Sequence, residues 1–184
     1  RTILELHQNY GFTKFIIVVP NIAIKEGVYK SLQITEDHFK SIFNNIVYEY
    51  FIYDSSKLEQ VRSFAISDNV QIMVINIDAF RRSFNIIHRH NDRLNGLRPI
   101  ELIRETNPIV IIDEPQSVDT TPKAKEAIRS LNPLCTLRYS ATHVEKHNLV
   151  YKLDAVDSYN LGLVKQIEVA GFESKDYHNK AYLK

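Results

Sequence analysis

Two adjacent carboxylates, Asp113 and Glu114, are the residues best suited to chemistry in this chain. They follow Ile109–Ile112, an apolar and mostly β-branched run that is typical of a strand buried on both faces of a parallel sheet. Pro115 then ends the strand. Open α/β sheets bind their ligands beyond the carboxyl ends of the strands. The sequence therefore predicts two acids at a ligand-binding edge.

The paired acids have separate tasks if the ligand is a nucleoside triphosphate with magnesium. Asp113 would hold the hydrated Mg²⁺ that bridges the phosphates, and Glu114 would orient or deprotonate the attacking water. The alternative is that both acids only stabilise the start of a following helix, where Asp and Glu are favoured.

A hydroxyl cluster follows a second candidate strand further along the chain. The segment Leu134–His143 (LCTLRYSATH) predicts a strand that ends in Ser140, Ala141 and Thr142, at the same sheet edge as Asp113. Its hydroxyls can hydrogen-bond the acidic pair and transmit its state. A plain turn or helix cap is the alternative, since Ser and Thr are ordinary choices there.

These segments together resemble a known family. DEPQ (113–116) and SAT (140–142) are similar to the Walker B segment and motif III of superfamily 2 helicases and translocases. With FIIVVPNIAIKEGVYKSL (15–32), essentially the whole chain resembles the ATPase region of type III restriction enzyme Res subunits. DEPQ is the more specific motif, because DEAD or DEAH is the usual form elsewhere in the superfamily.

The resemblance implies ATP- and Mg²⁺-dependent movement on double-stranded DNA, coupled in the parent protein to cleavage by a separate nuclease domain. It also implies a modification (methyltransferase) subunit as partner. By the same resemblance, Gln116, Ser140 and Thr142 would couple hydrolysis to movement.

The resemblance also implies DNA contacts at strand ends. Pro20 and Asn21 match the start of motif Ia, where backbone amides leaving a strand can meet a phosphate. Asn76, Asp78 and Phe80 match the later DNA-contacting motifs more loosely. For Pro20 and Asn21 a simple turn is the alternative.

One departure from the family pattern concerns the phosphates. The sequence has no segment of the form GxxxxGK[ST], whose backbone amides and lysine would hold them. The chain begins at Arg1, and Thr2–Tyr10 is typical of a helix already under way; in the family, this helix follows the phosphate loop. We therefore expect a fragment with the hydrolytic acids but without the phosphate loop, and little or no ATPase activity from the isolated chain.

Overall charge does not indicate a nucleic-acid binder, with 23 basic and 22 acidic residues. Local charge does. The segment from 81 to 98 has one acid, Asp92, against a set of basic residues: Arg81, Arg82, Arg89, Arg93 and Arg98, with His88 and His90. Such a cluster can neutralise DNA phosphates, with Arg81 and Arg82 as the candidate contacts. A solvated, mobile loop is the alternative.

Strand and helix patterns alternate along the chain, which favours a parallel sheet covered on both faces. We expect an α/β fold: a RecA-like three-layer αβα domain with a mainly parallel sheet. Residues 1–150 would form a partial motor lobe, and 151–184 a linker and the start of a following segment. Expected strands are 14–19, 48–53, 70–77, 109–112 and 134–143; expected helices are 2–10, 22–44 with a break near 31–35, 57–66, 99–105 and 120–131.

Composition agrees with one domain in a reducing cytoplasm. The single cysteine, Cys135, excludes a disulfide framework and a cysteine metal cluster. No apolar run approaches the length of a membrane span, and no signal peptide is visible at the amino end.

Other functions remain as alternatives. A non-hydrolysing DNA-binding or scaffold role is one alternative, since the sequence contains no phosphate loop. Asp157 with Glu173 and Lys175 matches the permissive D…ExK pattern of magnesium-dependent nucleases. The pairs His88 and His90, and His143 and His147, have spacings compatible with a shared metal, but surface or cap histidines fit better.

Overall fold

The structure is a computed structural model that describes residues 1–140 and 148–165. The chain divides into two compact units, Arg1–Val144 and Glu145–Lys184, which are described separately. Within the described residues, no helix has the length and apolar character needed to cross a membrane.

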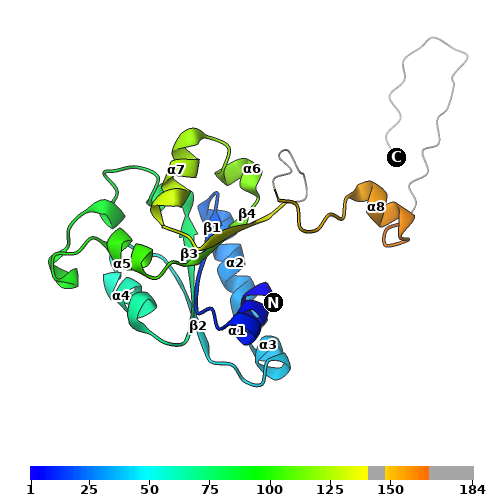
Figure 1. Cartoon of the computed structure of the whole chain (residues 1–184), viewed down its shortest axis with the longest axis horizontal. Coiled ribbons are helices and arrows are strands. Elements are labelled where there is room, and N and C mark those ends of the chain that lie inside the picture. Colours follow the sequence, from blue (N-terminus) through cyan, green and yellow to red (C-terminus); the bar gives the residue numbers. More distant parts are fainter. Residues whose placement is uncertain (141–147, 166–184) are drawn as a thin grey trace, which may run out of the picture. The chain divides into compact units, whose positions relative to one another are not determined.

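The first unit is built on a five-stranded parallel sheet in the order β2-β3-β1-β4-β5 (Figure 1). The strands are β1 (Lys14–Val19), β2 (Tyr48–Ile52), β3 (Val70–Asn76), β4 (Ile109–Asp113) and β5 (Cys135–Tyr139). In register, Val18 of β1 lies opposite Ile75 of β3 and Ile112 of β4. The ends of these strands therefore meet at one edge of the sheet.

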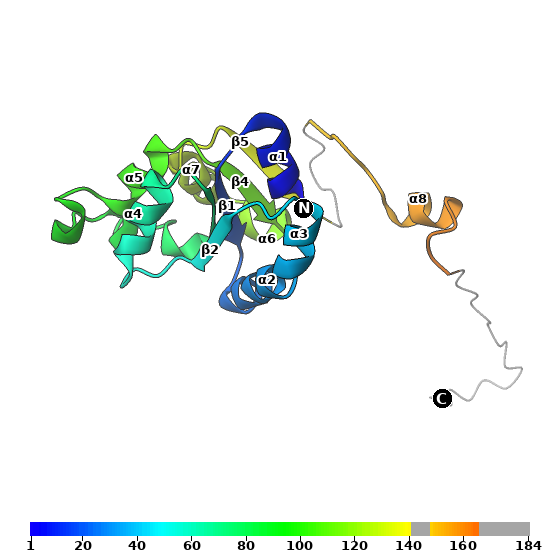
Figure 2. The ribbon, with the colours of Figure 1, turned by 90° about the horizontal axis from the view of Figure 1, so that it is seen from below.

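Helices cover both faces of this sheet (Figures 1 and 2). They are α1 (Thr2–Tyr10), α2 (Ile22–Ile34), α3 (Glu36–Ile42), α4 (Leu58–Ile66), α5 (Pro99–Glu105), α6 (Pro115–Val118) and α7 (Pro122–Ser130). The helices α1, α2 and α3 lie against one face, and α4, α5 and α7 lie against the other. The expected RecA-like three-layer α/β fold is confirmed.

The two cores follow from the alternation of side chains along β1. Phe15 and Ile17 point into the core shared with Ile3 of α1, whereas Ile16 and Val18 point into the core shared with α4, α5 and α7. Both faces of β1 are buried, so its continuous apolar run is what a central parallel strand requires.

The helix boundaries in the structure agree closely with those expected from the sequence. Helix α1 ends at Gly11, whose φ of 75° is a left-handed conformation that glycine adopts readily. The expected break falls at Thr35, between α2 and α3. The sequence did not predict α6, which occupies four residues directly after the acids.

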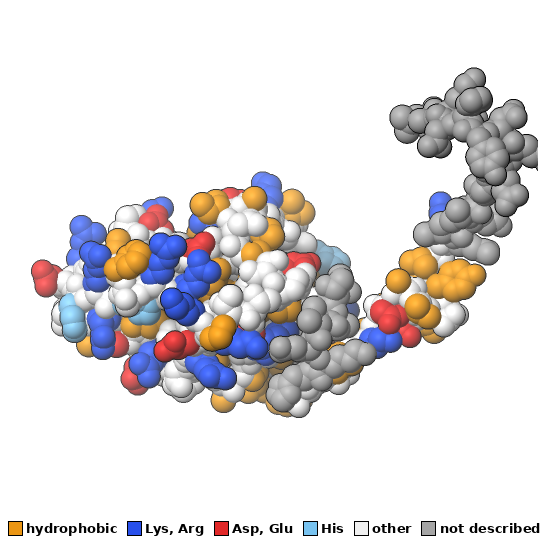
Figure 3. Space-filling view, turned by 90° about the horizontal axis from the view of Figure 1, so that it is seen from above, with side chains coloured by type: hydrophobic (Ala, Val, Ile, Leu, Met, Phe, Trp, Pro, Cys, Tyr) orange, Lys and Arg blue, Asp and Glu red, His pale blue; other side chains and the backbone are white. Residues whose placement is uncertain are grey.

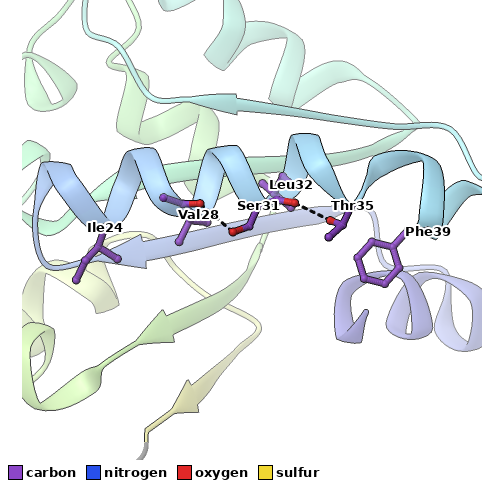
Figure 4. A pocket seen from close by; sticks show the side chains of 7 residues that line it. Ile24, Val28, Ser31, Leu32, Thr35 and Phe39 are labelled. Carbon is purple, nitrogen blue, oxygen red and sulfur yellow. Dashed lines mark hydrogen bonds between the residues drawn. The ribbon is translucent and has the colours of Figure 1, made fainter.

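Helix α2 is only partly covered. None of its residues is buried, and Ile24, Val28 and Leu32 face a shallow apolar groove of about 540 Å³ that continues to Phe39 (Figure 4). The hydroxyl of Ser31 in this groove donates to the Gly27 carbonyl at 2.9 Å, so it is satisfied within the helix.

The basic segment between β3 and α5 is not a loose loop. It contains three short 3₁₀ turns, Ile77–Ala79, Ile86–His88 and Asp92–Leu94. Ile87 is fully buried and Leu94 is 3% exposed, so apolar side chains fix the segment to the α4 and α5 face. The segment thus has buried anchor residues, while its arginines are mostly exposed, as the alternative of a solvated loop would have them.

The described part of the second unit contains one helix, α8 (Ala155–Asn160). At the start of α8, the Asp154 carboxylate accepts a hydrogen bond from the Asp157 backbone N–H. Lys152 forms ion pairs with the carboxylates of Asp154 and Asp157. The Lys152 contact, with the Asp157 N–H, lowers the pKa of Asp154 to about 2. The remainder of the segment expected at 151–184, from residue 166 on, lies outside the described residues.

Candidate functional site

The predicted acids lie at the carboxyl edge of the sheet, beside the end of β5. Asp113 is the last residue of β4 and pairs in register with Tyr139 of β5. The backbone N–H of Glu114 donates to the Tyr139 carbonyl at 3.1 Å. Both acids are half-exposed, so water can reach their carboxylates. The end of β5 thus fixes the backbone that presents them.

Glu114 adopts a left-handed backbone conformation, with φ 54° and ψ 60°. This conformation costs a non-glycine residue on the order of 1 kcal/mol or more. It turns the chain sharply from β4 into α6, where Pro115 occupies the first position and already has a suitable φ. The acid is therefore presented at a turn and not within a strand.

Glu114 occupies the N-cap position of α6, but its side chain makes no capping hydrogen bond. Its carboxylate instead accepts a short hydrogen bond from the side-chain amide of Gln116. The capping alternative is therefore not what the Glu114 side chain does here.

Gln116 links the acid to the next strand. The hydroxyl of Ser140, directly after β5, donates to the side-chain amide oxygen (Oε1) of Gln116 at 3.0 Å. Glu114, Gln116 and Ser140 thus form a continuous hydrogen-bonded series between the ends of β4 and β5. Thr142, the third residue assigned to coupling, lies outside the described residues.

Asp113 fits a metal that is bound through water. Its carboxylate has neither a hydrogen bond nor an ion pair within residues 1–140 and 148–165, and it stays accessible at the edge. No group of three or more His, Cys, Asp or Glu side chains gathers there or elsewhere in the described part. A magnesium ion held by one carboxylate would therefore need water and phosphate oxygens as its other ligands, as expected for a nucleotide-bound ion.

A second contact joins β5 to the residues that follow α6, and it was not predicted from the sequence. Arg138 of β5 donates from its guanidinium to Asp119, just after α6, at 2.7 and 2.5 Å. The Asp119 side chain is only 5% exposed, and its other oxygen is buried with no hydrogen-bond partner among the described residues. Nothing local in the sequence signals this pair, because its members are 19 residues apart and belong to different elements.

The residues expected to meet DNA at strand ends also have local structural tasks. Asn21 follows β1 at Pro20, and its side chain accepts from the Ile24 N–H at 2.9 Å, which caps α2. Asn76 lies opposite Val19 in the register of β3 and β1, and its side chain accepts from the Asp78 N–H at 2.8 Å. Both are brought to the same edge, and their contact with DNA stays a prediction.

The arginine-rich segment forms one wall of an open groove of about 1010 Å³, and α7 forms the other. We call this the basic groove. Its lining includes the cations Arg81, Arg82, Arg98 and Lys123 and the aromatic ring of Phe84. Arg89 and Arg93 belong to the same segment but do not line the groove. Seen from above, Lys and Arg side chains gather on the side where Figure 1 places this segment (Figure 3).

The residues considered for a metal site or a nuclease site either have structural partners or lie outside the described residues. His88 contacts the Phe80 carbonyl at 2.7 Å, and His90 contacts the Gly96 carbonyl at 2.7 Å, so the two rings serve the loop. Asp157 belongs to the capping arrangement of α8. Glu173, Lys175, His143 and His147 lie outside the described residues.

The parallel sheet, the acids at its carboxyl edge and the helices on both faces define the RecA-like class of α/β domains. Residues 1–145 match the family model described as "Type III restriction enzyme, res subunit". The chain belongs to this family, which confirms the resemblance drawn from DEPQ, SAT and the segment 15–32.

The chain is also similar to Res subunits of named type III restriction-modification enzymes. It is 29% identical to the EcoP15I Res subunit of Escherichia coli over 187 residues, which cover 91% of this chain and 19% of that protein. The EcoPI Res subunit of Escherichia phage P1 is 29% identical over 191 residues, with the same coverage. The StyLTI Res subunit of Salmonella typhimurium is 29% identical over 204 residues, 92% of this chain and 21% of that protein. The chain therefore spans about a fifth of the length of these relatives.

Proposed function

We propose that this chain is part of the ATPase motor of a type III restriction endonuclease Res subunit, and that the motor couples ATP hydrolysis to translocation on double-stranded DNA. The observation that supports this most is the hydrogen-bonded series Glu114, Gln116 and Ser140, which joins the acidic turn to the end of the next strand. A change at the acid would thereby reach β5 without crossing the core.

Each residue has a task that follows from its position. Asp113, without a protein partner in the described part, would hold the hydrated magnesium ion. Glu114 would accept the proton of the attacking water, and the Gln116 amide would orient its carboxylate. Magnesium-bound ATP, when present, would supply the phosphoryl group that the water attacks. Ser140 would respond through Gln116 when that hydrogen bond changes.

The phosphate-binding part of the site would have to come from a longer protein, because these 184 residues contain no GxxxxGK[ST] segment. The modification subunit would be a separate partner of that longer protein, and the nuclease domain to which the motor is coupled would also lie outside this sequence. A cytoplasmic location fits a restriction system, and double-stranded DNA would be the track on which the motor moves.

The test is DNA-stimulated ATP hydrolysis by the longer protein. Glu114→Gln should leave ATP binding nearly intact and slow hydrolysis by roughly two or more orders of magnitude, because it removes the group that accepts the proton. Asp113→Ala should also weaken magnesium binding. Glu105→Gln, the same change at an exposed glutamate in α5, is the matched control and should have no effect.

Wild-type hydrolysis rates in both acid variants would refute the assigned roles. A longer protein that binds DNA but never hydrolyses ATP would favour the second candidate, a non-hydrolysing DNA-binding or scaffold role. The absence of a phosphate loop from this sequence is the observation that keeps this second candidate open.

A further inference from the structure

We propose that the basic groove binds the sugar–phosphate backbone of double-stranded DNA and constitutes a sequence-independent contact of the motor domain. The inference rests on the part of the proposed function that concerns DNA, and it does not depend on ATP hydrolysis. From the sequence, the proposed DNA contact was the arginine-rich segment as a whole. The groove limits this contact to a defined surface and includes α7, which nothing in the sequence connects with DNA.

Positively charged side chains outnumber negatively charged ones in the lining of the groove. Its lining includes one acid, Glu126, against Arg81, Arg82, Arg98 and Lys123. Two of these cations have carboxylate partners, since Arg81 pairs with Asp78 at 2.6 Å and Arg98 pairs with Glu101 at 2.6 Å.

Arg82 and Lys123 differ from the other two cations. In the parts of the chain that the structure describes, neither has a carboxylate within ion-pair distance. They belong to opposite walls, because Arg82 follows β3 and Lys123 lies in the first turn of α7. Two cations facing the same groove from separate elements can neutralise neighbouring phosphates of one strand.

The other lining groups suit a sugar–phosphate chain. The Phe84 ring is 59% exposed, and the Arg82 guanidinium lies 5.7 Å from its centre. This arrangement holds the guanidinium over a flat apolar surface while leaving its N–H groups available to phosphate oxygens. The hydroxyls of Ser83 and Thr121 add donors of the kind that contact phosphates in DNA complexes.

The wall that carries Arg82 and Phe84 is held in place before any ligand binds. Ile87 is fully buried, the His88 ring contacts the Phe80 carbonyl at 2.7 Å, and the Asn85 amide donates to the Asp78 carbonyl at 2.5 Å. A preorganised wall loses little conformational entropy on binding. Binding therefore does not require the segment to fold first.

The experiment compares two double variants of the 184-residue chain by fluorescence anisotropy with a labelled duplex, over a series of salt concentrations. Arg82→Gln with Lys123→Gln removes the two unpaired groove cations. Lys30→Gln with Arg93→Gln removes the same charge from the exposed face of α2 and from the arginine segment outside the groove. Thermal unfolding of each variant checks that the fold is retained.

If each groove cation neutralises one phosphate, the slope of log K against log salt should fall by about 2 in the groove variant, and binding at about 0.1 M salt should weaken roughly 60-fold. The control should change the slope far less. The loss should be equal for duplexes of different sequence, because phosphates carry no sequence information.

Three outcomes would overturn the inference. Equal losses in the two double variants would place DNA binding elsewhere on the chain and leave the proposed motor intact. Displacement of the duplex by polyglutamate at equal charge concentration would indicate a site for an acidic polypeptide. A chain that binds no duplex would remove the groove as a DNA site, while hydrolysis by the longer protein, which is assayed separately, would still decide the proposed function.

Discussion

The Arg138–Asp119 pair gives a stability prediction whose size follows from burial. Asp119 is 5% exposed, whereas the Arg138 side chain is 48% exposed. In Arg138→Met the Asp119 carboxylate loses both guanidinium contacts, at 2.7 and 2.5 Å, and its other oxygen already has no partner within residues 1–140 and 148–165. The substitution thus leaves an uncompensated charge in the core rather than merely removing a surface contact.

Removing one partner from a fully buried ion pair costs about 3–5 kcal/mol. Because water reaches the exposed half of Arg138, we reduce this and expect Arg138→Met to lower the free energy of unfolding by about 2 kcal/mol. With a urea slope of about 2 kcal/mol per molar, the unfolding midpoint should fall by roughly 1 M.

Urea unfolding followed by circular dichroism measures this shift. The double variant Asp119→Leu with Arg138→Met should recover most of the loss, because it removes the buried charge together with its partner. Arg1→Met, which breaks the exposed pair with Glu5 at 3.1 Å, should cost less than about 0.5 kcal/mol. A loss in Arg138→Met no larger than in Arg1→Met, or a double variant weaker than the single, would refute the reasoning.

Three further changes test the local structure. Asn21→Ala removes the cap on the Ile24 N–H and should cost about 1 kcal/mol, measured by urea unfolding; a neutral effect would contradict the capping role. Gly11→Ala forces an alanine into φ 75° and should cost about 1 kcal/mol in the same assay, although no neighbouring atom obstructs the added methyl. Burial and the hydrogen bond to Glu36 raise the pKa of Tyr50 above its usual 10.0, so stability is present below that pH and lost as pH rises beyond it. Tyr50→Phe should therefore weaken the fall in unfolding free energy above about pH 10, which alkaline melts measure; an unchanged fall would show that other groups cause it.

The strands and the acidic turn were predictable because their signals are local. Ile109–Ile112 is apolar on both faces, and only a central parallel strand buries such a run. The position of Asp113 at the ligand edge then follows from the class of fold. The same local logic gave the break near Thr35 and the helix end at Gly11.

What the sequence did not predict depends on contacts between distant segments. Asp119 and Arg138 meet because β5 lies beside β4, and neither residue has a distinctive neighbour pattern. Lys123 joins the basic groove only because α7 packs on the same face as the arginine segment. Buried Ile87, an ordinary apolar residue in a polar stretch, was the available sign that this segment is not loose.

The position of β5 at the side of the sheet has a practical consequence. In the described part of the chain it pairs with β4 alone, and its residues Cys135–Tyr139 are half-buried or exposed. A strand with one unpaired row of N–H and C=O groups is a template for another strand. Expressed on its own, the described part of this chain offers that row to other copies, so concentrated samples are at risk of edge-to-edge aggregation. Arg138 is the charged side chain on β5, and its charge opposes such pairing.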